Sequence, residues 1–201
     1  MSYIPDEIYD RIEELKKKGD LNDALEIVNS ILVKDPLNEK ALFQVVDIEY
    51  LRGNISNAEK PVDFLMRFKG IDDPMTYYVK GVLEMEKTNW VQAKIMFRKA
   101  IDMFDSPNPE TWRCYGLSEY WHGNRERGIE YILKAFELNN KDAEIIYNLV
   151  ELHLLEHDYE AAKNYVEYYY KHRDQVDTYS KDIGFYDEKI KLFQDFLNTI
   201  K

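Results

Sequence analysis

The stretch PETWRCYGLSEYWHGNRERGIEYILKAFELNNKD, residues 109–142, decides the fold. It predicts two amphipathic helices that are separated by a turn at Gly123-Asn124. Each helix of such a pair keeps an apolar face that its partner alone cannot cover, so a unit of this length does not close a core by itself. We therefore expect copies of the unit beside it.

The turn dipeptide does recur along the chain, at intervals of 34 or 35 residues. The five copies are Gly19-Asp20, Gly53-Asn54, Thr88-Asn89, Gly123-Asn124 and His157-Asp158. Five positions after the first member of each stands a small residue: Ala24, Ala58, Ala93, Gly128 or Ala162. Glycine allows a left-handed helix end, Asp or Asn can N-cap the next helix, and a small residue lets two helices approach closely.

This pattern resembles the tetratricopeptide repeat, whose 34-residue unit favours an aromatic residue at position 4, Gly at 8, Gly-Asp at 15 and 16, and Ala at 20 and 27. In the fourth unit Trp112, Gly116, Gly123 and Ala135 match. The resemblance implies a single domain over residues 1–201, with units at about 5–38, 39–72, 74–107, 109–142 and 143–176. The implied fold is all-α, a right-handed solenoid of antiparallel helix pairs with about 11 helices.

The last segment departs from the repeat phase. Residues 177–184 are polar, and an amphipathic helix is predicted at about 185–200 because apolar residues recur at offsets of three and four. This stripe consists of Tyr186, Ile190, Phe193, Leu197 and Ile200. Such a helix can cover the exposed end of a solenoid.

A proline falls inside the second helix of the second unit. The spacing of Ser56 and Glu59 fits a capping box, which predicts that Ser56 is the N-cap and that Pro61 lies one turn inside the helix. We expect a mild kink there.

Composition excludes several functional classes. The 201 residues contain 27 Lys plus Arg against 38 Asp plus Glu, a net charge of −11 that disfavours nucleic acid as a partner. No apolar run is long enough to span a bilayer, so membrane insertion is not expected. The single cysteine, Cys114, cannot form an intramolecular disulfide, and no secretory signal is visible at the start. These features favour a cytoplasmic location.

One string suggests catalysis. His153-Leu-Leu-Glu-His157 fits the H-x-x-E-H arrangement of inverted zinc peptidases, and both histidines would share one helical face. In the repeat register, however, His153 takes the place of a packing aromatic and His157 the place of the turn glycine. They are weak metal candidates only, and we expect no cofactor and no enzymatic activity.

The resemblance also implies a partner-binding groove, lined by positions 2, 5, 9 and 12 of each first helix. Its residues include Phe43, Asp47, Tyr50, Tyr78, Val82, Met85, Arg113, Leu117, Tyr120, Tyr147 and Glu151. Arg113, Leu117 and Tyr120 are expected to be the residues of the central helix that are free to meet a ligand. An aromatic and apolar groove with acidic residues suits a peptide with apolar anchors and Lys or Arg. The alternative is that several of these aromatics only contact adjacent repeats.

The sequence thus predicts a non-enzymatic scaffold or adaptor that binds a protein or peptide segment in its concave groove. The rival hypothesis is a structural protein that forms homo-oligomers through its convex face or its terminal helix.

Overall fold

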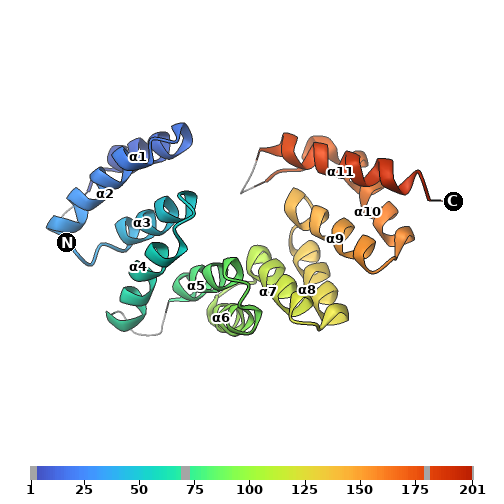
Figure 1. The fold of residues 1–201 in the computed structure, drawn as a ribbon, viewed down its shortest axis with the longest axis horizontal. Helices are drawn as coiled ribbons and strands as arrows, with labels where there is room; N and C mark the ends of the chain where they lie inside the picture. The colour runs from blue at the N-terminus through green and yellow to red at the C-terminus, as the bar shows by residue number, and fades with distance from the viewer. Residues whose placement is uncertain (1–3, 69–72, 179–181, 201) are drawn as a thin grey trace. The chain divides into compact units, whose positions relative to one another are not determined.

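A computed structural model describes residues 4–68, 73–178 and 182–200 of the chain (Figure 1). These ranges contain eleven α-helices and one short 3-10 helix, η1 (Arg173–Gln175). The α-helices are α1 (Asp6–Lys18), α2 (Leu21–Lys34), α3 (Glu39–Leu51), α4 (Ile55–Phe68), α5 (Pro74–Glu86), α6 (Trp90–Met103), α7 (Pro109–Trp121), α8 (Arg125–Leu138), α9 (Ala143–Leu155), α10 (Tyr159–Lys171) and α11 (Ile183–Leu197). The prediction of an all-α fold built from helix pairs is confirmed. None of the helices in the described ranges has the length and apolar character to cross a membrane.

The chain divides into two compact units, Met1–Asn89 and Trp90–Lys201. The first contains α1 to α5 and the second α6 to α11, so the two helices of the third repeat belong to different units. The expectation of one continuous domain stays a prediction.

The predicted turns are all present, and each contains one residue with a positive φ angle. These residues are Gly19 (82°), Gly53 (70°), Thr88 (57°), Gly123 (107°) and His157 (60°). The left-handed conformation ends the first helix of each pair and lets the second begin within three residues. Glycine adopts this conformation without a steric penalty, whereas Thr88 and His157 do not.

We predict that Thr88→Gly stabilises the protein by about 1 kcal/mol, because a β-branched residue with positive φ is strained and glycine is not. Thermal denaturation followed by circular dichroism measures the effect. Thr88→Ala removes the branch but keeps Cβ, so its gain should be smaller. A Gly variant that unfolds at lower temperature than the wild type would refute the strain argument.

The expected N-caps form only in part. The side chain of Asp158 accepts a hydrogen bond from the Ala161 amide, but Asp20 and Asn124 cap nothing with their side chains. The prediction is therefore wrong for Asp20 and Asn124. The Asn124 amide instead donates to the carboxylate of Glu119, which lies buried one turn back.

The small residues of the pattern lie where helices of a pair cross. Ala24, Ala58, Ala93 and Ala162 have no exposed surface, and Gly128 is buried as well. The closest crossing joins α7 and α8, where a Cβ atom on Gly116 would lie 2.7 Å from the carbonyl oxygen of Gly128. No side chain fits at that point, which explains glycine on both helices.

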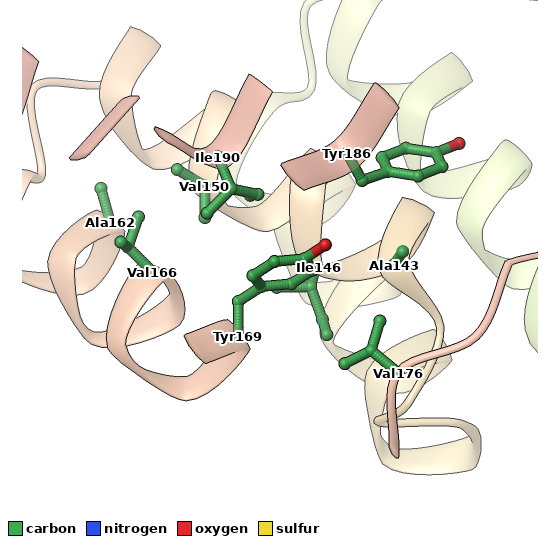
Figure 2. Close-up of a cluster of buried hydrophobic side chains, with 9 residues drawn as sticks. All are labelled: Ala143, Ile146, Val150, Ala162, Val166, Tyr169, Val176, Tyr186 and Ile190. Carbon is green, nitrogen blue, oxygen red and sulfur yellow. The ribbon is translucent and has the colours of Figure 1, made fainter. Parts of the chain in front are cut away.

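Helix α11 covers the end of the second unit. Tyr186 and Ile190 join the buried cluster of α9 and α10 (Figure 2). Phe193 and Leu197 pack against this cluster. The predicted apolar stripe is confirmed over these four residues. The helix runs from Ile183 to Leu197, however, so the expected bounds of 185–200 were shifted and Ile200 lies outside it.

Two further sets of contacts connect the C-terminal segment to α9 and α10. The carboxylate of Asp187 on α11 accepts hydrogen bonds from Tyr169 of α10 and from the guanidinium of Arg173. Upstream, Asp142 and Asp177 form an isolated parallel β-bridge. The segment after the fifth repeat is thereby tied to the start of α9.

The prediction for the proline was wrong in its details. Helix α4 begins at Ile55, and the Asn54 carbonyl accepts hydrogen bonds from Asn57 and Ala58, so Ser56 is not the N-cap. Pro61 lies in the second turn, where it leaves the carbonyl of Asn57 without its usual helical donor. The helix nevertheless continues to Phe68.

Candidate partner-binding faces

The first helices of the first unit are linked side by side through polar contacts. Lys16 of α1 donates to Gln44 and Asp47 of α3, at 2.9 and 3.2 Å. The Tyr50 hydroxyl of α3 donates to Glu86 of α5 at 2.7 Å. These bonds place the predicted groove residues of α3 and α5 on one face of the unit, which we call the first inner face.

The first inner face exposes apolar and aromatic surface. Phe43, Tyr78, Val82 and Met85 are partly exposed, and Tyr50 is 39% exposed. Met75, one turn before Tyr78 on α5, is 42% exposed. A surface of this kind can be covered by a partner, and its methionines can adapt to the partner's shape.

Carboxylates flank this apolar surface. The Lys16 ammonium lies between Glu13 and Asp47, so two acids share one cation. Burial opposes ionisation of Glu13, but hydrogen bonds from Lys16 and Gln44 outweigh it and lower the pKa of Glu13. Burial raises the pKa of Asp47, although Lys16 opposes the shift. The Asp47 side chain is nevertheless 56% exposed, and the exposed Glu86 accepts a hydrogen bond from Tyr50, so both carboxylates lie at the surface of this face.

The equivalent residues of α7 in the second unit are buried. Arg113, Leu117 and Tyr120 are 7%, 8% and 4% exposed. The expectation that these three side chains are free to meet a ligand is therefore wrong. Helix α7 is buried continuously from Thr111 to Tyr120, because α6 and α8 pack against it and side chains of α9 contact it.

An ion cluster holds Arg113 in place. Its guanidinium donates to both carboxylate oxygens of Glu110, at 2.7 and 2.5 Å, and to Asn148 of α9 at 3.0 Å. Glu144 of α9 lies 3.4 Å away. Burial disfavours the charged guanidinium, but the surrounding acidic groups outweigh it and raise the pKa of Arg113 well above its usual range. Burial, reinforced by Glu110, also raises the pKa of the neighbouring Cys114 thiol.

Two predicted groove tyrosines of this unit also form hydrogen bonds within the protein. The Tyr120 hydroxyl donates to Glu156, and burial together with that carboxylate raises the pKa of Tyr120 to about 12. The Tyr147 hydroxyl donates to Glu151 at 2.6 Å, and its ring stacks on Phe193 of α11 at 5.5 Å. Tyr147 thus contacts both Glu151 and the terminal helix.

Sequence reasoning missed a set of buried carboxylates. Glu49, Glu84 and Glu119 take the same place in the second, third and fourth repeats, and each is at most 6% exposed. Glu84 and Glu119 accept hydrogen bonds from the side-chain amides of Asn89 and Asn124 in the following turns. The signal was available, since these glutamates recur every 35 residues and each precedes an Asn by five positions.

Asp142 is another buried acid, at the N-cap of α9. Its carboxylate accepts from the amides of Glu144 and Ile145, yet burial raises its pKa to about 6. Because the folded pKa exceeds the unfolded value of about 3.9, the folded state binds the additional proton between those values. The contribution of Asp142 to stability is therefore favourable in acid and is lost as the pH rises through 6.

We predict that Asp142→Asn stabilises the protein at pH 7.5 by about 1–3 kcal/mol, because Asn caps a helix equally well without a buried charge. At pH 4 the two proteins should be similar in stability. Urea denaturation at the two pH values measures the difference, and Asp182→Asn, at the exposed N-cap of α11, is the matched control. A deficit for Asp142→Asn at both pH values would contradict the prediction.

The two histidines of the H-x-x-E-H string contact different residues. His153 lies 3.3 Å from Asp158 and stacks on Tyr165. His157 forms the left-handed turn and contacts the Tyr159 hydroxyl. Across residues 4–68, 73–178 and 182–200, no group of three or more His, Cys, Asp or Glu side chains is placed to hold a metal ion.

No protein-family model and no curated protein matches the sequence, but solved structures match its fold. PilW, a widely conserved type IV pilus biogenesis factor, is 15% identical with a TM-score of 0.76, over 87% of this chain and 80% of its own. A tetratricopeptide repeat protein from Parabacteroides merdae is 17% identical with a TM-score of 0.72, over 93% and 70%. YrrB, a TPR protein with an unusual peptide-binding site, is 14% identical with a TM-score of 0.57, over 80% and 81%. The chain therefore has the fold of tetratricopeptide-repeat proteins, as its sequence predicts.

Proposed function

We propose that this protein is a non-enzymatic interaction module that binds a segment of another protein on the inner face of its first helices. The observation that carries the proposal is the partly exposed stripe of Phe43, Tyr50, Tyr78 and Val82, which lies on neighbouring helices beside carboxylates. Aromatic side chains that lose their hydration to a partner supply much of the binding energy of protein interfaces.

The fold supports the same function. Tetratricopeptide-repeat proteins generally serve as protein-interaction scaffolds, and the related fold of YrrB holds a peptide-binding site. The net charge of −11 favours a partner with basic residues over a nucleic acid. A cytoplasmic location belongs to the proposal, because Cys114 is a buried free thiol.

Affinity capture with the full chain, followed by reconstitution with the purified captured protein, tests the proposal. Titration calorimetry should give a saturable interaction of about micromolar affinity, and Tyr78→Ala on the first inner face should weaken it at least about tenfold. The control is Val33→Ala, a change at an 84% exposed residue of α2. The proposal fails if no captured protein binds directly, or if Tyr78→Ala and Val33→Ala both bind like the wild type.

Self-association is the second candidate, because α11 exposes Leu192 (54%) and Phe196 (49%) at the end of the second unit. If these residues hold two chains together, light scattering should show a mass that rises with concentration. Leu192→Glu combined with Phe196→Glu should then return a monomer. A concentration-independent mass of one chain in the wild type would exclude this candidate.

A further inference from the structure

We infer that the first unit alone holds the partner, on α3 and α5, and that the partner is an amphipathic segment carrying Lys or Arg. This inference rests on the proposed function and narrows it. Positions 5, 9 and 12 of the first helices are equivalent in the repeat, so their exposure can be compared directly between helices.

The comparison separates α3 and α5 from α7. On α3 and α5, the residues at position 5 (Phe43, Tyr78) and position 12 (Tyr50, Met85) are partly or well exposed, whereas Tyr9 at position 5 of α1 is 6% exposed. In α7, position 5 is the Arg113 that Glu110 and Glu144 enclose. A ligand could reach that arginine only by breaking a buried ion cluster, which is costly.

Position 9 shows the same difference. Val82 of α5 is partly exposed, whereas Leu117 of α7 is 8% exposed. In α9, position 5 is Tyr147, which is partly exposed like Phe43 and Tyr78 but differs from them because its ring contacts Phe193 and Tyr186 of the terminal helix. Helix α11 therefore already occupies a contact surface that would otherwise be available to a partner.

Charge on the first inner face determines the chemistry of the partner. The Lys16 side chain is only 10% exposed and is shared by Glu13 and Asp47, so its charge is not presented to solvent. Lys40 lies over the Tyr9 ring and pairs with Asp6. The Asp47 side chain is 56% exposed, and Glu86, which accepts from Tyr50, is exposed as well, so both carboxylates can accept further hydrogen bonds. Cationic side chains of a partner complement these carboxylates.

The dimensions fit a short helical or extended segment. From Phe43 to Tyr50 the stripe on α3 covers seven residue steps, or about 10 Å of helix. The Tyr50–Glu86 hydrogen bond joins this stripe to α5, so the two helices together offer a small surface for two or three apolar anchors. Such a patch is small, which makes the flanking charges important for the orientation of the partner.

Two synthetic peptides of about 14 residues test the inference with the full chain. Both have leucines at the spacing of one helical face, but one carries lysines and the other glutamates at the remaining positions. Fluorescence anisotropy should show saturable binding of the lysine peptide and at least about tenfold weaker binding of the glutamate peptide. Equal binding of the two would overturn the assignment of a basic partner.

Matched variants locate the site. Val82→Asp on α5 should weaken binding of the lysine peptide at least about tenfold, because it charges a partly exposed apolar contact. Leu155→Asp, at a 47% exposed residue of α9, is the control in the second unit and should bind like the wild type. Circular dichroism spectra and melting curves check that both variants are folded. Loss of binding with Leu155→Asp but not with Val82→Asp would place the site in the second unit and overturn the inference.

Failure of the inference can be told apart from failure of the proposed function. Suppose that neither peptide binds, but a captured protein binds directly and loses affinity with Tyr78→Ala. The proposed function as an interaction module is then retained, and only the inference of a basic amphipathic partner is rejected. If no direct protein partner is found at all, the proposed function itself fails.

Discussion

Gly116→Ala is expected to destabilise the second unit by about 3 kcal/mol, although the same change in an ordinary helix interior is favourable by about 1 kcal/mol. The reason is the contact between α7 and α8. A Cβ atom on Gly116 would lie 2.6 Å from Cγ1 of Ile132 and 2.7 Å from the carbonyl oxygen of Gly128. Because one of these neighbours is backbone, the helices must move apart to admit a methyl group.

Gly128→Ala should have a similar effect, since its Cβ would lie 2.6 Å from Cβ and 2.7 Å from the amide nitrogen of Tyr120. Gly123→Ala is the control. No atom lies within 4 Å of its Cβ, but φ is +107°, so it should cost only about 1–2 kcal/mol from backbone strain. Urea denaturation followed by tryptophan fluorescence measures all three. If Gly116→Ala were as stable as the wild type, α7 and α8 could not be as close as they are in the structure.

The sequence predicted the turns because they depend on local chemistry. Gly19, Gly53 and Gly123 end helices in a conformation that glycine favours, and the fixed interval showed that Thr88 and His157 occupy the same place. The terminal stripe was also predictable, since Tyr186 and Ile190 lie on one helical face and an apolar face must be covered. These features require only periodicity.

Which residues of the predicted groove are exposed could not be predicted in the same way. The position of Arg113 in the repeat suggested a ligand contact, but Glu110, Glu144 and Asn148 come from two helices and meet only in the folded unit. Likewise, the register of Tyr147 could not show that Phe193 of the terminal helix would cover its ring. Which residue on a stripe is exposed depends on tertiary partners, and periodicity contains no information about them.

The second large effect is expected at Arg113. Arg113→Ala should destabilise the second unit by about 3–5 kcal/mol, because it leaves the carboxylates of Glu110 and Glu144 without the cation between them. Cys114 provides an independent readout, since it is the single cysteine and lies buried beside the cluster with a raised pKa. Its reaction with a thiol reagent should be much faster in the variant than in the wild type.

A compensating variant separates charge from packing in this cluster. Arg113→Met together with Glu110→Gln and Glu144→Gln removes all three charges while it keeps most of the buried volume, so it should recover most of the lost stability. The deficit of Arg113→Ala should also be smaller in acid than at neutral pH, because protonation neutralises the carboxylates that lost their partner. If the triple variant were as unstable as Arg113→Ala, the arginine would act mainly through its packing and its hydrogen bond to Asn148. Recovery would instead show that the contacts between α7 and α9 depend on a balanced set of buried charges.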